Sequence, residues 1–338
     1  MTVQKHPIKN IDQLRLAYDA EVRAFLANKG ILAMIMEECV EEFANCPLSD
    51  IAEKYITGKP QIFEVGVDKD TTNPTAAHFS QNIPPNVPEI SNEDTSETEG
   101  TVRYDIRFLA KAPKEDGFVE LIINLEAQRN YFPGYPIVTR GVYYASRMIS
   151  AQKGVEFSGN HYEEIKKVYS IWVCYDPPKN RENTIVSYHM KEDFLVKGKK
   201  TKIEPRNHYD LLSVIIIGLG DPDEALSSRT LRILSTVFSN RKKREEKKNI
   251  LQSELNIVYD TNTEERMNAM CDISWGIWED GKAEGKEEGK IEGKAEGARE
   301  TSLKLSLMGL SENKIAEAVG FPVKTVSEWI RSQAAAIG

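Results

Sequence analysis

The chain has 338 residues, of which 40% are hydrophobic and 28% charged, a balance that excludes disordered and fibrous proteins. No apolar run approaches the ~20 residues that a membrane-spanning helix needs, and residues 1–10 lack a signal-peptide core. The net charge is −8, yet residues 101–209 carry 18 basic and 13 acidic side chains. This segment therefore has a net charge of +5, and the remaining residues have a net charge of −13. We therefore expect a cytoplasmic protein that does not enter membranes. Its basic middle is compatible with a nucleic-acid groove or with an ordinary solvated surface.

Cysteine and histidine residues give no sign of a metal or disulfide framework. The four cysteines contain no CxxC pair, and the five histidines are scattered along the chain. With no signal segment predicted, this usage indicates reduced thiols rather than disulfides or a zinc site.

The N-terminal third predicts helices followed by a long loop. Residues 1–30 predict a polar arm with a short helix, and 31–43 predict an amphipathic helix. A further short helix is expected at 51–56 and a first strand at 61–67. Residues 68–100 are rich in Pro, Asn, Thr, Ser and acidic side chains, which is typical of a loop.

Two strongly patterned strands follow. Residues 101–110 and 119–127 alternate between apolar and polar side chains, and the Asp116-Gly117 pair between them favours a hairpin. Asp105 lies on the polar face of the first strand, and Glu126 and Gln128 lie on the polar face of the second. We therefore expect Asp105 and Glu126 to project from one face, because facing residues of an antiparallel pair have Cα atoms ~5 Å apart.

The remainder of the central region alternates helix and strand. We expect a helix at 136–152, a strand at 168–175 that ends before Pro177-Pro178, and a helix from Asp221 to about Phe238. The apolar run 211–219 fits either a buried strand or a helix, because periodicity does not distinguish the two.

The C-terminal quarter changes character. Within 261–300, glycine recurs at every fourth position in KAEG-like repeats, which predicts a charged, marginally helical or flexible spacer. Residues 301–338 predict a compact helical module. Its segment SENKIAEAVGFPVKTVSEWIR has Ala316, Gly320, Val326 and Trp329 at helix-turn-helix spacing.

Asp105 and Glu126 carry the chemical hypothesis. Two carboxylates at such a separation repel each other unless a hard cation lies between them or one stays protonated. Magnesium prefers oxygen ligands of this kind, and it can polarise a phosphate and acidify a bound water. The pattern therefore suggests phosphodiester hydrolysis, while an ordinary exposed hairpin face is the alternative.

The ordered segments EGTVRYDIRF, LIINLEAQRNYFPGYP, TRGVYYASRMIS and KKVYSIWVCYDPP carry a resemblance that covers roughly residues 31–240. The chain resembles the PD-(D/E)XK nuclease superfamily, and within it the transposase-like, recombination-promoting branch. The resemblance implies an α/β, restriction-endonuclease-like core of order αβββαβ, with a mixed sheet flanked by helices. The domains would then be an arm at 1–30, the nuclease domain at 31–260, a spacer at 261–300 and the module at 301–338.

Residue by residue, the resemblance assigns Asp105 and Glu126 as ligands of Mg²⁺, with Mn²⁺ as a substitute. Gln128 stands where the superfamily usually has lysine. Glutamine can orient a water but cannot stabilise negative charge as Lys⁺ does. Helix-borne or strand-borne acids could complete such a site, and the candidates are Glu38, Glu42 and Glu64, each of which could equally be solvated.

Basic side chains suggest DNA contacts. The central candidates are Arg107, Arg129, Arg140 and Arg147, although arginine stems that cover the sheet are the alternative for the last two. In the C-terminal module the exposed side of the second helix would carry Lys324, Thr325 and Arg331. A helical hairpin used for homo-oligomerisation is the alternative for this module.

These observations together predict a Mg²⁺-dependent endodeoxyribonuclease, a hydrolase with DNA as its partner, in a recombination or mobile-element setting. A catalytically weak or inactive DNA-binding protein of the same fold is the first alternative. An assembly protein that oligomerises through the glycine repeat is the second.

Overall fold

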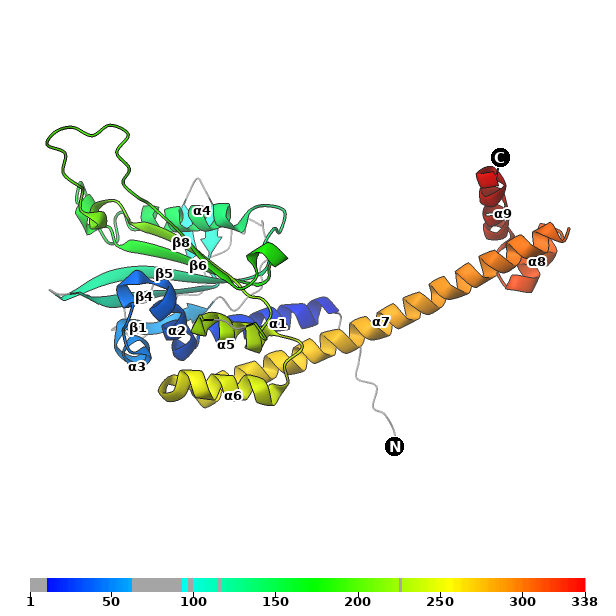
Figure 1. Cartoon of the computed structure of the whole chain (residues 1–338), viewed down its shortest axis with the longest axis horizontal. Helices are drawn as coiled ribbons and strands as arrows, with labels where there is room; N and C mark the ends of the chain where they lie inside the picture. The colour runs from blue at the N-terminus through cyan, green and yellow to red at the C-terminus, as the bar shows by residue number, and fades with distance from the viewer. Residues whose placement is uncertain (1–10, 63–92, 97–99, 115–116, 225–226, 338) are drawn as a thin grey trace. The chain divides into compact units, whose positions relative to one another are not determined.

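The computed structural model describes residues 11–62, 93–96, 100–114, 117–224 and 227–337 (Figure 1). The candidate Glu64 and most of the predicted loop 68–100 lie outside the described residues. The chain divides into two compact units, one ending at Ser274 and one beginning at Trp275. Within the described ranges, no helix is both long and apolar enough to cross a bilayer.

The first unit is an α/β domain built on a six-stranded mixed sheet. Its strands lie in the order β1-β4-β5-β6-β8-β7, in which β1, β4 and β5 are antiparallel, β5, β6 and β8 are parallel, and β7 is antiparallel to β8. Two short strands, β2 and β3, pair separately. The bounds are β1 (Ile56–Ile62), β2 (Glu93–Ser96), β3 (Gly100–Arg103), β4 (Ile106–Lys114), β5 (Gly117–Asn130), β6 (Lys167–Asp176), β7 (Thr184–His189) and β8 (Leu212–Gly218).

Helices cover both faces of the sheet (Figure 1). One face carries α4 (Ile137–Ser150), and the opposite face carries α1 (Ile11–Leu26), α2 (Lys29–Cys39), α3 (Leu48–Asp50), α5 (Arg229–Phe238) and α6 (Arg244–Leu255). Short helical turns are η1 (Glu41–Phe43), η2 (Ile51–Tyr55), η3 (Tyr162–Glu164), η4 (Lys179–Arg181), η5 (Arg206–His208) and η6 (Asn256–Val258). Each face has its own apolar core, and the core shared with α1, α2 and α5 is the larger.

Strand position explains the sequence patterns. Along β5, Ile123 and Leu125 point into the larger core, while Ile122 points into the core under α4. The central strand β6 is buried along most of its length on both faces, as parallel strands usually are, and therefore reads as a continuous apolar run. The segment 211–219, which periodicity left open, forms β8 because it lies between β6 and β7.

Several boundaries differ from those that the sequence predicts. Residues 1–30 are not simply a polar arm, because α1 packs into the larger core through Val22, Phe25 and Leu26. The first strand, β1, begins at Ile56, before the predicted start at residue 61, and residues 63–67 of that prediction lie outside the described residues. The predicted strand 101–110 is interrupted at Tyr104 and Asp105. Helix α5 starts at Arg229, not at 221, because the Ser228 side chain accepts a hydrogen bond from Leu231 N at 3.0 Å and caps it there.

The second unit is entirely helical. It contains the greater part of α7 (Thr261–Leu307), followed by α8 (Glu312–Val319) and α9 (Val323–Ile337). The glycine repeat, predicted as a marginal or flexible spacer, lies within the continuous helix α7. Ala316 and Val326 are buried between α8 and α9, and Gly320 adopts φ +69° at the turn that joins the two helices.

Candidate functional site

The β4–β5 hairpin brings Asp105 and Glu126 into direct contact. Ile106 pairs with Leu125, so Asp105, one residue before β4, falls beside Glu126. The backbone N–H of Asp105 donates to Glu126 Oε1 at 3.1 Å, and the N–H of Ala127 donates to Asp105 Oδ2 at 3.0 Å. The two carboxylates are therefore fixed by the backbone of each other's strand, which leaves Oδ1 of Asp105 and Oε2 of Glu126 as the candidate ligand atoms.

Asn124 lies on the same face of β5 and completes this arrangement. Its side-chain Nδ2 donates to Glu126 Oε1 at 2.9 Å. Its Oδ1 is buried and has no hydrogen-bond partner among the described residues. A buried acceptor without a partner costs about 1–3 kcal/mol, so it is an observation that calls for a ligand. A donor such as a water on a bound cation would satisfy it.

Burial sets the electrostatics of the pair. Burial raises the pKa of Asp105, and it raises the pKa of Glu126 well above its usual range, with the charge of Asp105 as the second cause. Positive charges act in the opposite direction: Arg23 and Arg140 lower the pKa of Asp105, and Arg140 lowers that of Glu126. These cations offset only part of the desolvation of two neighbouring carboxyls.

Arg140 is held in a frame of aromatic rings on the first turn of α4. Its Nη1 donates to the hydroxyl of Tyr135 and its Nη2 to that of Tyr144, each at 2.6 Å. The guanidinium carbon lies 5.0 Å from the ring centre of Tyr144 and 5.5 Å from that of Trp172. These contacts fix the guanidinium near the carboxylate pair, and no described residue forms a direct ion pair with it.

Gly141 sets how closely α4 approaches the sheet. A Cβ at this position would lie 2.5 Å from Cγ1 of Val214 and 3.0 Å from Nε1 of Trp172. Only glycine therefore allows the helix to pack at this depth, and the depth determines where Arg140 is presented.

Sequence reasoning missed the contribution of α1. Arg23 is the largest favourable charge acting on Asp105, and Asp19 of the same helix acts on it unfavourably. Asp19 accepts a hydrogen bond from the hydroxyl of Tyr175 at 3.2 Å. No local motif marks these residues, because their relevance depends on α1 packing against the sheet.

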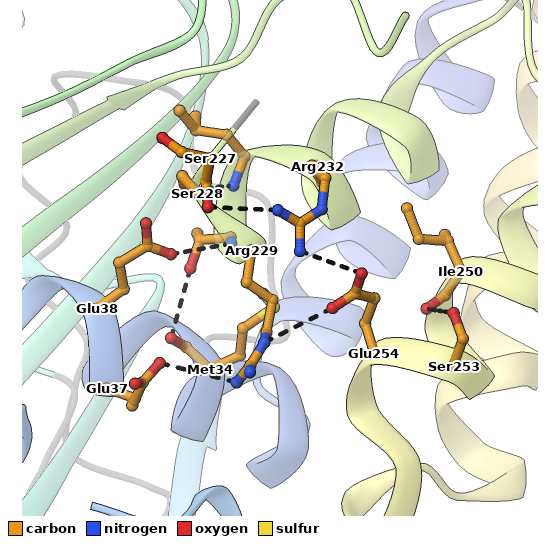
Figure 2. Close-up of polar contacts among 12 residues, drawn as sticks. Met34, Glu37, Glu38, Ser227, Ser228, Arg229, Arg232, Ile250, Ser253 and Glu254 are labelled. Carbon is orange, nitrogen blue, oxygen red and sulfur yellow. Dashed lines mark hydrogen bonds and ion pairs between the residues drawn. The ribbon is translucent and has the colours of Figure 1, made fainter. Parts of the chain in front are cut away.

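The structure does not bring Glu38 or Glu42 to the pair. Both lie on the opposite face of the sheet, and each has a partner there. Glu38 Oε2 accepts the backbone N–H of Thr230 at 3.0 Å, at the N-terminus of α5, in the polar cluster of Figure 2. Glu42 pairs with Lys167 at 3.2 Å and accepts a hydrogen bond from Tyr169. The first caps a helix and the second neutralises a lysine, so neither completes the site.

The remaining central candidates divide by burial. Gln128 lies on the face of the pair, but its Nε2 donates to the backbone oxygen of Asn130 at 3.0 Å. Arg107 and Arg147 are only 6% and 4% exposed, so neither can form the direct DNA contact that the sequence suggested. Arg129 is exposed and follows Gln128, so the alternation of β5 points it to the other face.

Two carboxylates, not three, form the candidate site. Across the described ranges, no group of three or more His, Cys, Asp or Glu side chains is arranged to hold a metal ion. A cation between Asp105 and Glu126 would thus take its other ligands from water and substrate oxygens, as Mg²⁺ does in many phosphoryl-transfer sites.

In the C-terminal module, the candidate DNA-contacting residues lie on α9. Lys324 and Arg331 are exposed and Thr325 is partly buried, while Val326 points into the small core with Ile315. The exposed side of α9 therefore carries Lys324 and Arg331.

Comparison with known proteins gives no match to this chain: no family model, no curated protein and no solved structure matches it significantly.

Proposed function

We propose that the chain is a metal-dependent endonuclease that hydrolyses DNA phosphodiester bonds. The observation that carries the proposal is the Asp105–Glu126 pair, in which Glu126 is buried and Asp105 partly buried, backed by the unpartnered Oδ1 of Asn124. Two neighbouring carboxyls and a buried acceptor without a partner beside them fit a hydrated divalent cation better than they fit a structural hydrogen-bond network.

The order of elements supports a restriction-endonuclease-like core. Helix α2 is followed by β1, β4 and β5 of the six-stranded sheet, then by α4 and β6, which is the order αβββαβ once the short helix α3 and the separate β2–β3 pair are set aside. We propose that this is the PD-(D/E)XK arrangement of the transposase-like branch, and that the protein acts in the cytoplasm in recombination or on mobile elements. Asp105 and Glu126 stand at the positions that hold the metal in that superfamily.

Mg²⁺, or Mn²⁺ in its place, would be held by Oδ1 of Asp105 and Oε2 of Glu126. When bound, it would polarise the scissile phosphate and lower the pKa of a water. Asn124 Oδ1 would accept a hydrogen bond from that water and so orient it. Because Gln128 donates its amide to Asn130, we assign water orientation to Asn124 rather than to Gln128.

Arg140 supplies the positive charge that a lysine would bring in place of Gln128. Its guanidinium is fixed by Tyr135 and Tyr144 and acts electrostatically on Glu126. A preorganised cation stabilises the negative charge that develops on the phosphate without reorganisation during the reaction. The candidate site thus combines two metal-holding acids, one water acceptor and one fixed arginine.

The second unit would add DNA binding and pairing between two copies. Lys324, Thr325 and Arg331 would contact DNA from α9. In the repeat, glutamate precedes and lysine follows each of Gly285, Gly289 and Gly293. The glutamate and the lysine therefore lie on opposite sides of the glycine positions around the helix. Two parallel copies of α7 would place the lysine of one copy opposite the glutamate of the other.

The testing experiment is nicking of supercoiled plasmid with Mg²⁺ or Mn²⁺, beside EDTA and Asp105→Ala controls. We expect metal-dependent cutting that the substitution removes. DNA binding without cutting by a folded protein would instead favour the alternative, a DNA-binding protein that has lost its chemistry. For pairing, deletion of residues 281–300 should reduce the solution mass of an oligomer to that of one chain.

A further inference from the structure

Three exposed aromatic side chains lie on α4 and in the segment that joins β5 to α4. Phe132 is 62% exposed, Tyr135 38% and Tyr143 46%. Aromatic residues directly after a buried strand are usually core residues, and Tyr131 follows that expectation with 6% exposed. Phe132, Tyr135 and Tyr143, which we call the stacking surface, do not.

Two residues of the stacking surface, Tyr135 and Tyr143, adjoin Arg140. The hydroxyl of Tyr135 accepts a hydrogen bond from Arg140, whose charge acts on Glu126. Tyr143 follows Arg140 by three positions on α4 and therefore lies one turn further on the same side of the helix. Its ring centre is 6.4 Å from that of Tyr144, a residue whose pKa is raised by burial and then by the charge of Glu126.

The surface is also held in place before any ligand arrives. Phe132 packs edge-on against Tyr131, with ring centres 4.9 Å apart. The Tyr131 ring is itself held by Arg181, whose guanidinium carbon lies 5.8 Å from the ring centre. Gly134, at φ +98°, makes the turn that directs the chain from Phe132 to Tyr135. Rings fixed in this way lose little conformational entropy when a planar ligand stacks on them.

We propose that the stacking surface binds unpaired bases of the DNA strand whose phosphate enters the Asp105–Glu126 site. Fixed rings beside a fixed guanidinium match the stacking platforms of single-strand-binding proteins, where bases stack on aromatics and cations follow the backbone. In an intact duplex the base faces are covered by neighbouring bases, so these rings have nothing to stack on. The substrate class is therefore single-stranded or locally opened DNA. This inference rests on the proposed nuclease function of the same site.

The test is binding of one oligonucleotide that carries 2-aminopurine, compared as a single strand and as a duplex, with Ca²⁺ as the cation. Stacking on a ring quenches the fluorescence of the probe base. We expect quenching and tighter binding for the single strand, and a loss on the order of ten-fold in its affinity for Phe132→Ala and Tyr143→Ala. Tyr143→Phe should bind as the unmodified protein does, because it keeps the ring.

Tyr162→Ala is the matched control, since Tyr162 is 56% exposed and lies outside the stacking surface. Equal binding of duplex and single strand, or unchanged affinity and quenching in both alanine variants, would overturn the inference. Either result would leave metal-dependent plasmid nicking unaffected, so it can be told apart from failure of the proposed function. Loss of binding in Tyr162→Ala of the same size would also overturn it.

Discussion

The two faces of the central sheet both carry buried or partly buried glutamates, and the difference between them is instructive. On the face covered by α2 and α5, both described candidate glutamates have a partner: Glu38 caps α5, and Glu42 pairs with Lys167. The neighbouring Glu37 also lies 3.8 Å from Arg229, which approaches Glu254 (Figure 2). On the face covered by α4, Glu126 has a second carboxylate as its neighbour.

Acids that are paired with a hydrogen-bond donor or a cation, as on the face covered by α2 and α5, stabilise a fold. An acid placed against another acid in a buried position is costly unless something else is bound there, because each carboxylate raises the free energy of the charged form of the other. Both kinds of site contain glutamate, so residue type does not distinguish them. They differ in whether a donor, a cation or a second carboxylate lies beside the glutamate. The comparison therefore supports the choice of the α4 face of the sheet for the proposed site.

The strongest test of the comparison removes one acid from each face. Glu126→Gln keeps the hydrogen bonds that Oε1 accepts but removes a metal ligand, so plasmid nicking should fall by a factor on the order of 100 or more. Glu38→Gln should leave nicking nearly unchanged and lower the free energy of unfolding by about 1 kcal/mol, because it weakens the α5 contact. Equal loss of nicking in both variants, measured on protein of equal helicity, would contradict the assignment.

The packing of α4 offers a second test. Gly141→Ala places a Cβ 2.5 Å from Val214, so we expect a loss of about 1–3 kcal/mol in the free energy of unfolding and weaker nicking as Arg140 is displaced. Gly285→Ala is the matched control within α7, where an added Cβ meets nothing within 4 Å. That change should stabilise its helix by up to about 1 kcal/mol. Urea unfolding followed by circular dichroism measures both.

Arg140→Lys sharpens the electrostatic part of the comparison. Lysine keeps the charge but cannot donate to Tyr135 and Tyr144 in the geometry of the guanidinium, so the cation is no longer fixed. We expect nicking to fall by about ten-fold with little change in thermal stability. Arg229→Lys on the opposite face is the control, and it should leave the nicking rate unchanged.

The pH dependence of stability provides the finest test. Burial raises the folded-state pKa of Glu126 above its unfolded value, so its contribution to stability is fully present below the unfolded pKa and is lost as pH rises through the folded one. In the absence of metal, the melting temperature of the unmodified protein should therefore fall, relative to that of the Glu126→Gln variant, as pH rises toward neutrality and above. Added Mg²⁺ should restore it in the unmodified protein only. Parallel pH profiles of the two proteins would argue against a buried charged pair.

Much of the fold could be predicted because its signals are local. Alternation along β5 predicted that Asn124 and Glu126 share one face, and the Asp116-Gly117 pair predicted the hairpin. The spacing around Gly320 predicted the C-terminal helix pair. Boundaries were less certain, since a cap such as that of Ser228 competes with helix propensity over several residues. The break at Asp105 had no local signal.

By itself, the sequence determined which side chains share a strand face and therefore that Asp105 and Glu126 meet. Only the tertiary structure decided what surrounds them. The charge of Arg23 acts on Asp105 because α1 packs on the sheet. Glu38 accepts a hydrogen bond from α5 because α2 lies on the other face, and Gly141 allows α4 to pack closely on the sheet. These relations join residues far apart in the chain, and their energies depend on burial and distance, which periodicity along a single strand or helix does not encode.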